Sequence, residues 1–348
     1  MQPPPVATNP DDDASAAGSY LTDEVRTTCA AVAREAQSVI IQHDALPDYA
    51  RALMRTSASP PEIDPAYHVL ADEATTTAYF VTLDSINFGS GYFPAMCKRP
   101  GLSGYFTVAL ALKENFEREG PWTAERLAAT TPAACAATFG QAPEFPLMAL
   151  FARALNDLGR LLLAQYQGDP LRLVRAAGGS AERLAQTLTA MPFYRDVAGY
   201  GGRRVVFYKR AQLAAADLAL ALASPAARAG PAGPAPLVVD GEPLFHDLDR
   251  LTIFADNVVP HVLRVDGLLR YAPDLLARIE AEVPIPSGSP EEIELRACAV
   301  HVVELLKAEL ARAGHLVTSG QLDYYLWNRG RGSVYKSRPR HRSPGVYY

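Results

Sequence analysis

Apolar residues recur three and four positions apart along most of the chain, which is the spacing of an amphipathic helix. The pattern is clear in the segment from Leu21 to Ser38, and Gly- and Pro-rich breakers separate it from further segments of the same kind. The spacing predicts helices over the ranges 21–38, 70–83, 103–118, 145–166, 169–177, 180–190, 208–223, 250–269, 273–282, 289–313 and 319–329. Such a pattern is typical of a mainly α-helical protein.

Signals for other structure are few. Runs of β-branched and aromatic residues predict short strands at 38–41 and 204–208. Residues 1–19 are Pro-rich and then acidic, and we expect them to form a disordered tail. The Ala-, Gly- and Pro-rich run 226–236 is expected to be a flexible loop. We therefore expect a single helical domain over residues 20–348, with at most a few short strands.

Length and charge narrow the class of protein. The chain has 348 residues, 49% of them hydrophobic, which is enough for one substantial core. A net charge of -5 and only five lysines argue against a surface that binds nucleic acid. No apolar run approaches the roughly 20 residues that a membrane helix needs, and the first residues lack the basic-then-apolar pattern of a secretory signal. We expect a monomeric cytoplasmic protein without a nucleic-acid or membrane partner.

The sequence offers no metal or cofactor motif. The seven histidines form no cluster with metal-ligand spacing, and the four cysteines lie far apart, as expected for buried thiols. Phosphate-loop, dinucleotide-binding, zinc-protease and serine-hydrolase motifs are all missing. We therefore expect neither a metal ion nor an organic cofactor.

Two stretches near the predicted helix ends suggest a binding site. Residues 82–94 place Asn87 and Phe88 in a turn-rich loop, which suits a pocket for a planar heterocycle or a loop packed by its own aromatic residues. Lys209 and Arg210 open a predicted helix, where the helix dipole disfavours cations. An anion such as a phosphate at the same helix end would explain them, and a solvated basic turn is the alternative.

Two further stretches carry acidic residues. The apolar run in 247–260 leads directly to Asp256 and Asn257. A carboxylate in apolar surroundings is a candidate for a shifted pKa and a catalytic role, and the alternative is that Asp256 caps the next helix. Residues 321–329 place Asp323, Tyr324 and Asn328 on one predicted helix, where the alternative is ordinary helix packing.

Taken together, the motifs DSINFGSGYF, FYKRAQ, IFADNVVP, EIELRAC and LDYYLWN resemble those of the queuosine salvage protein family, in the same order, over nearly the whole chain from about residue 20. The resemblance implies a hydrolase that cleaves the N-glycosidic bond of queuosine 5'-monophosphate and releases queuine and ribose 5-phosphate. It also implies a helical fold similar to the helix-hairpin-helix DNA glycosylases.

The resemblance assigns expected roles to individual residues. Asp256 becomes the carboxylate that stabilises an oxocarbenium-like transition state, either by directing water or by covalent attack. Asp323 would accept hydrogen bonds from the guanine-like edge of the base, and Lys209 and Arg296 would hold the 5'-phosphate. The remaining expected substrate contacts are stacking by Phe254, Phe88 or Tyr324, hydrogen bonds from Asn328 and His43, and further contacts by Asn87 and Asn257.

Two other interpretations stay open. A nucleic-acid base glycosylase of related helical architecture would use the basic segment from Arg329 to Arg342. A noncatalytic module would bind queuine or the nucleotide and form no product.

Overall fold

The computed structural model describes residues 20–56, 61–228, 237 and 243–348. The expected tail at 1–19 lies outside the described residues, and so does most of the expected loop at 226–236. The first residues of that loop belong to a short helix, α11 (Pro225–Arg228).

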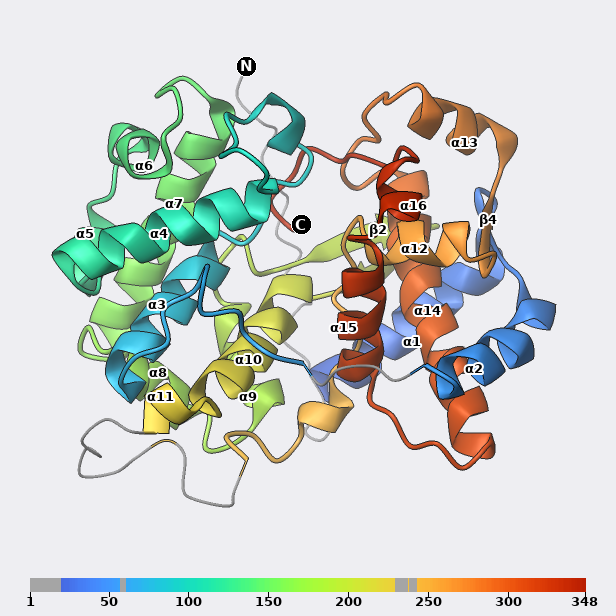
Figure 1. Cartoon of the computed structure of the whole chain (residues 1–348), viewed down its shortest axis with the longest axis horizontal. Helices are drawn as coiled ribbons and strands as arrows, with labels where there is room; N and C mark the ends of the chain where they lie inside the picture. Colours follow the sequence, from blue (N-terminus) through green and yellow to red (C-terminus); the bar gives the residue numbers. More distant parts are fainter. Residues whose placement is uncertain (1–19, 57–60, 229–236, 238–242) are drawn as a thin grey trace.

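The described residues form a mainly α-helical structure, as predicted (Figure 1). Its other helices are α1 (Leu21–Glu35), α2 (Leu46–Met54), α3 (Glu73–Ser85), α4 (Gly104–Glu119), α5 (Ala124–Ala128), α6 (Pro132–Phe139), α7 (Pro146–Gln165), α8 (Pro170–Ala176), α9 (Ala181–Leu188), α10 (Lys209–Leu222), α12 (Val259–Val265), α13 (Pro273–Glu280), α14 (Pro290–Arg312), α15 (Ser319–Arg329) and α16 (Ser333–Lys336), with short 3-10 turns η1 (His43–Ala45), η2 (Phe93–Ala95) and η3 (Leu248–Arg250). The predicted likeness to helix-hairpin-helix DNA glycosylases stays a prediction, as does the single domain.

Two antiparallel strand pairs complete the described structure. Strand β1 (Val39–Ile41) pairs with β4 (Leu269–Tyr271), with Val39 opposite Tyr271. Strand β2 (Val197–Tyr200) pairs with β3 (Arg203–Val206) as a hairpin. The strand predicted at 38–41 is thus confirmed, and the one predicted at 204–208 begins and ends slightly earlier.

The helix predicted over 250–269 is wrong for most of its length. Only α12 is helical there, and residues 251–258 have no regular structure. The residues from Leu251 to Ala255 are all buried, so their apolar run reflects burial on every side rather than one helical face. Pro260, in the first turn of α12, suits a helix start because its missing N–H has no intrahelical partner there.

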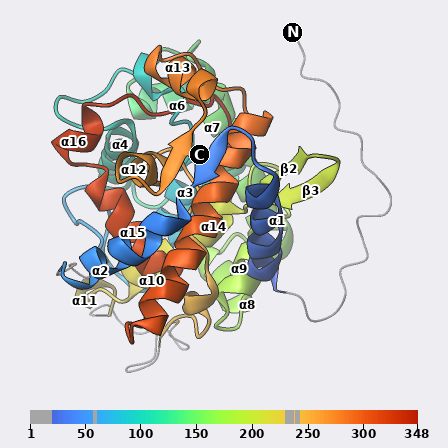
Figure 2. The ribbon, with the colours of Figure 1, turned by 90° about the vertical axis from the view of Figure 1, so that its right-hand side faces the viewer.

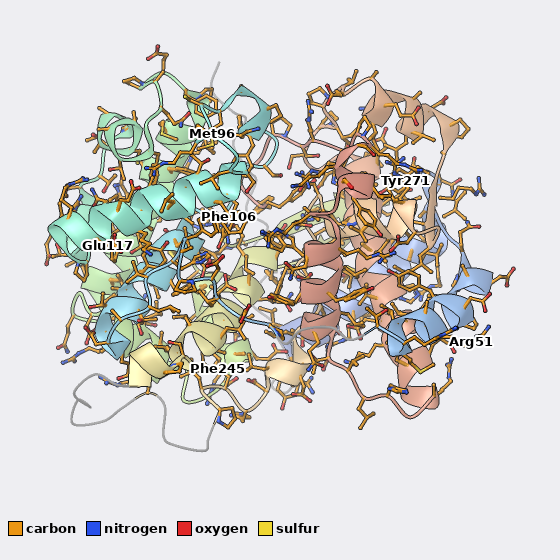
Figure 3. The ribbon with its side chains drawn as sticks, viewed as in Figure 1. Arg51, Met96, Phe106, Glu117, Phe245 and Tyr271 are labelled. Atoms are coloured by element: carbon orange, nitrogen blue, oxygen red, sulfur yellow. The ribbon has the colours of Figure 1, made fainter. Side chains whose placement is uncertain are left out.

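Helices from both ends of the chain pack around α14. Helices α1, α2 and α12 contact it, and Figure 2 shows α1 lying alongside it. In Figure 1, α4 to α8 occupy one half of the molecule and α12 to α16 the other. Aromatic rings join the halves, since Phe106 of α4 lies 6.3 Å from the ring of Trp327 on α15 (Figure 3).

Buried acidic side chains of α14 hold neighbouring backbone in place. Glu294 is 2% exposed. Its carboxylate accepts hydrogen bonds from the backbone N–H groups of Ser38 (2.6 Å) and Val39 (3.0 Å) and from the Tyr200 hydroxyl (2.8 Å). One side chain therefore anchors the start of β1 and the end of β2.

No helix of the described residues combines the length and hydropathy that crossing a membrane would require.

Replacing Glu294 should therefore destabilise the fold. Glu294→Ala leaves two backbone donors, one of them buried, and one tyrosine hydroxyl without their acceptor, so we expect the free energy of unfolding to fall by about 2–4 kcal/mol. Denaturant unfolding measures this. The control is Glu309→Ala on the same helix, where the acid pairs with Arg312 near the surface; we expect a change within about 0.5 kcal/mol. Equal stability of the two variants would contradict the anchoring role.

Candidate active site

The irregular segment 251–258 is held by side chains from three helices. Gln212 of α10 accepts from the Thr252 backbone N–H (2.8 Å), and Asp323 of α15 accepts from that of Phe254 (2.8 Å). Arg296 of α14 donates through Nε to the Ala255 carbonyl (3.1 Å). Buried backbone groups need such partners wherever a helix or sheet does not supply them. The segment is thereby fixed up to the residue before Asp256.

Asp256 caps the helix that follows it, which was the alternative interpretation of its position. Its Oδ1 accepts from the backbone N–H groups of Val258 (2.7 Å) and Val259 (3.0 Å) at the start of α12. The side chain is only half-buried, and its Oδ2 makes no hydrogen bond with the described residues. Capping by one oxygen therefore orients the carboxylate and leaves the other oxygen available.

Charged groups from three parts of the chain surround Asp256. Lys209 and Asp323 lie within electrostatic range of it, as does Arg340 of the C-terminal segment. Burial lowers the pKa of Lys209, and the negative charge of Asp256 opposes that effect. Burial, and then the charge of Asp256, raise the pKa of Asp323 well above its usual range. The neutral form of Asp323 is thus favoured.

At the start of α10 the backbone N–H of Lys209 has an acidic partner within the chain. Asp196 accepts from the Lys209 backbone N–H (3.2 Å) through Oδ2. The same carboxylate forms a two-pronged pair with the Arg296 guanidinium, with 2.9 Å between Nη1 and Oδ1. The Arg296 guanidinium, 1% exposed, also stacks on the rings of Phe207 and Tyr348. These contacts suit a residue that positions Ala255 better than one that holds a phosphate.

Arg210 is also buried and engaged. Its guanidinium donates to the carbonyls of Phe193 (2.8 Å), Val346 (3.2 Å), Asp84 (3.0 Å) and Ser85. It therefore ties the end of α3 to the C-terminal segment. The ammonium of Lys209, in contrast, is on a side chain only 7% exposed and makes no hydrogen bond or ion pair within the described part of the chain.

The other predicted contacts are only partly gathered near Asp256. Phe254 is buried two residues before it in the chain, and Tyr324 and Asn328 are half-buried on α15, the helix that carries Asp323. Asn257 is buried, and Asn87 donates to Asp84 Oδ1 (3.3 Å).

Two further predicted contacts have other neighbours. The ring of Phe88 is buried edge-to-face against Phe151 and Phe193, so packing already occupies it. His43 is exposed in η1, where its electrostatic neighbour is His301 of α14.

Sequence reasoning missed several groups around the site. Asp217 interacts electrostatically with Lys209 and with Tyr105, and Asp196 and Gln212 position backbone. A signal for Asp217 was present, since it follows Lys209 by eight residues on one helix and so shares its face. No local pattern pointed to Asp196, whose partner is 100 residues away.

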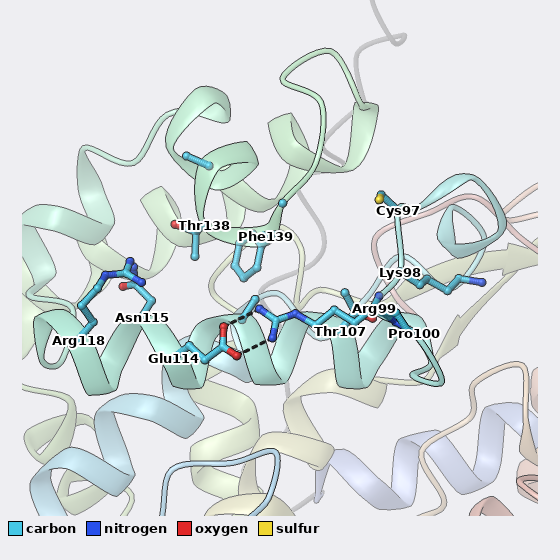
Figure 4. Close-up of a pocket in the computed structure, with 13 residues that line it drawn as sticks. Cys97, Lys98, Arg99, Pro100, Thr107, Glu114, Asn115, Arg118, Thr138 and Phe139 are labelled. Atoms are coloured by element: carbon cyan, nitrogen blue, oxygen red, sulfur yellow. Dashed lines mark hydrogen bonds and ion pairs between the residues drawn. The ribbon is translucent and has the colours of Figure 1, made fainter.

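Two cavities of the described residues lie away from this site. One, of about 470 Å³, lies against α4 and α6 and is lined by Arg99, Glu114 and the exposed Cys97, among others (Figure 4). The other, of about 420 Å³, is lined by residues that include His68 and Lys113.

The expectation of a buried thiol is wrong for Cys97, and the other three cysteines are buried. Within the described ranges, no three His, Cys, Asp or Glu side chains are placed to hold a metal ion.

Comparisons with known proteins agree on one family. Residues 67–348 match the model of a family described as queuosine salvage protein. A queuosine 5'-phosphate N-glycosylase/hydrolase of Sphaerobacter thermophilus is 36% identical over 331 residues, which cover 93% of this chain and 97% of that protein. Proteins of the same name from Mus musculus and Bos taurus are 29% and 30% identical, covering 91% and 80% of this chain and 96% and 82% of theirs.

The pair of Arg296 and Asp196 should be sensitive to a conservative change. Arg296→Lys keeps the charge but loses the two-pronged contact and the bond to Ala255, so we expect the free energy of unfolding to fall by about 2–4 kcal/mol. Denaturant unfolding measures it against Arg312→Lys, a change at an exposed arginine of the same helix, expected to stay within about 0.5 kcal/mol. A variant as stable as the parent would remove this pair from the account.

Proposed function

Because the chain belongs to the queuosine salvage protein family, we propose that it hydrolyses the N-glycosidic bond of queuosine 5'-monophosphate and releases queuine. The observation that supports this most directly is the state of Asp256. One carboxylate oxygen is held by two backbone N–H groups, and the other has no partner among the described residues. A carboxylate held through one oxygen, with the other oxygen open to a ligand, suits a reaction in which positive charge develops on a sugar.

In the proposed reaction, Asp256 faces the anomeric carbon of the ribose. Cleavage of the bond between this carbon and the base passes through an oxocarbenium-like transition state, which a nearby carboxylate stabilises. Asp256 then either directs a water molecule to that carbon or attacks it first. The base is a 7-deazaguanine without N7, so protonation there does not assist its departure. Hydrogen bonds to the pyrimidine edge must help instead.

The residues around Asp256 receive matching roles. Asp323, fixed through Oδ1 by the Phe254 N–H, contacts the pyrimidine edge of the base with its other oxygen. Phe254 or Tyr324 stacks on the heterocycle. Arg296 positions the segment through Ala255.

Lys209 binds the 5'-phosphate in this proposal, since its buried ammonium has no direct partner of its own among the described residues. The net charge of -5 favours a free nucleotide over nucleic acid as the substrate. The monomeric state and the cytoplasmic location stay predictions.

Replacing Asp256 tests the proposal. In Asp256→Asn the amide oxygen can still accept from Val258 and Val259, so the fold should persist while the negative charge is lost. We expect queuine release from queuosine 5'-monophosphate to fall by about 10²–10⁴-fold, measured by mass spectrometry. The control is Asp249→Asn in η3, an exposed acid on the same connecting segment, which should keep the parent rate.

Each outcome decides between interpretations. Normal turnover by Asp256→Asn would remove Asp256 from catalysis. A parent protein that binds queuine but forms no product at high concentration would favour the noncatalytic module. Release of a base from duplex DNA or RNA, sensitive to salt, would favour the nucleic-acid glycosylase.

The phosphate role of Lys209 is tested with the two products. Lys209→Met should weaken inhibition by ribose 5-phosphate about 10-fold to 100-fold, because a charge-assisted hydrogen bond is lost, and change inhibition by queuine much less. Inhibition constants for both products measure this, with Lys307→Met on α14 as the control. Equal losses for both products would contradict a phosphate contact.

A further inference from the structure

The C-terminal segment, residues 340–348, is packed into the interior of the protein. His341, Ser343 and Tyr348 are 2%, 2% and 4% exposed. In Figure 1 and Figure 2 the letter C, which marks the end of the ribbon, lies near the centre of the molecule. The last residues of a domain are poorly ordered unless contacts hold them in place. The proposed reaction gives this segment no role, so the contacts that hold it call for an explanation.

Main-chain hydrogen bonds tie the segment to two distant parts of the chain. The Arg342 carbonyl accepts from the N–H of Ile285 (2.8 Å), which lies a few residues before α14. The main-chain oxygen of Tyr348 accepts from the N–H groups of Gly89 (3.2 Å) and Ser90 (3.3 Å), in the loop that follows α3. These bonds fix the position from which the Tyr348 side chain extends.

The ring of Tyr348 lies against the buried guanidinium of Arg296. The centre of this ring is 4.9 Å from the Cζ atom of Arg296, and the centre of the Phe207 ring is 3.9 Å from the same atom. Both rings are buried. The face of an aromatic ring is electrostatically negative, so it attracts a guanidinium, and most strongly where water is excluded. Arg296 therefore has aromatic contacts in addition to its carboxylate partners, Asp196 and Glu292.

The orientation of the Arg296 guanidinium decides where its Nε–H points. The group is planar, and its five N–H donors project from it in a fixed geometry. Its two Nη atoms pair with Asp196, while Nε donates to the Ala255 carbonyl (3.1 Å). A tilt of the plane would turn the Nε–H away from Ala255, and Asp256 is the next residue. Rings that cover the guanidinium oppose such a tilt.

We propose that Tyr348 is a positioning residue for Asp256 and acts through Arg296, an inference that rests on the proposed function. The loop after α3 holds the main chain of Tyr348, the Tyr348 ring holds the plane of Arg296, and Arg296 holds Ala255. The Asp256 carboxylate is thereby placed against the sugar by a residue far along the chain. A displacement of about 1 Å at a reacting group costs up to about 100-fold in rate, so a weaker hold on Arg296 lowers kcat.

Fluorinated phenylalanines at position 348 test the attraction of the ring with little change in its shape. Tyr348→Phe keeps the ring, and each ring hydrogen replaced by fluorine makes the face less negative. We expect Tyr348→Phe to keep kcat within about twofold. Up to three added fluorines should lower kcat stepwise by about threefold to tenfold in total, and should change KM by less than about twofold. Initial rates of queuine release measure both constants. A kcat independent of fluorination would overturn the proposal, since a ring that only fills space does not depend on the charge of its face.

The matched control is the same series at position 335. Tyr335 is also buried, and the centre of its ring lies 5.3 Å from the Cζ atom of Arg329, which pairs with Asp266. Fluorination there should leave kcat at the value of the Tyr335→Phe variant. An equal fall of kcat in both series would reveal a general effect of fluorination and would also overturn the proposal.

A crystal structure of Tyr348→Met measures the geometry without the reaction. Met fills much of the space of the ring but lacks its negative face. We expect Arg296 Nε to move beyond hydrogen-bond distance of the Ala255 carbonyl, to more than about 3.5 Å, while the pair with Asp196 persists. An Nε bond kept at the parent distance would contradict the role of Tyr348. If this variant does not fold, the fluorinated proteins, which keep the ring, decide the question.

Failure of this inference and failure of the proposed function are distinguishable. A parent protein that forms no queuine from queuosine 5'-monophosphate would refute the function, and the crystal structure of Tyr348→Met would still show whether Tyr348 orients Arg296. A parent that hydrolyses the nucleotide, with a kcat unaffected by fluorination at position 348, would refute the inference alone.

Discussion

The site depends on the buried ion pair between Arg296 and Asp196. Asp196 lies just before the hairpin of β2 and β3 and also accepts from the N–H of Lys209, where α10 begins. Arg296 reaches from α14 to the carbonyl of Ala255, the residue before Asp256. One pair of charges thus sets the start of α10 and the end of the irregular segment relative to each other. Each partner compensates the other's burial, and Arg296 also pairs with Glu292 (3.6 Å), so losing Arg296 would leave two carboxylates in the core without their cation.

Irregular backbone next to such a pair can be as well fixed as a helix. Residues 251–258 have no regular hydrogen-bonding pattern, yet side chains of α10, α14 and α15 hold their backbone groups, and α12 takes up the Asp256 carboxylate. The arrangement points a carboxylate from a loop with the precision that a rigid element normally provides. It also explains why the FYKRAQ, EIELRAC and LDYYLWN motifs accompany IFADNVVP, since the first three supply the side chains that hold the fourth.

The sequence correctly predicted the helices whose apolar residues line a single buried face. The spacing over 145–166 and 289–313 gave α7 and α14 nearly to the residue. The spacing failed at 250–269, where an irregular segment buried on all sides has the same run of apolar residues as a helix. It also missed short helices such as α5. Glu294 of the EIELRAC motif anchors β1 and β2, a role that the sequence did not indicate. The pair of Asp196 with Arg296 joins residues 100 positions apart, and no local pattern reveals it.

The proposed reaction requires that Asp256 Oδ2 faces the sugar. A crystal structure of the protein with queuine and ribose 5-phosphate bound together measures this directly. We expect Asp256 Oδ2 to lie about 3–3.5 Å from the anomeric carbon, with the base against Asp323. Ligands bound elsewhere, for example in the cavity against α4 and α6, or an Asp256 carboxylate turned away from the sugar, would contradict the account.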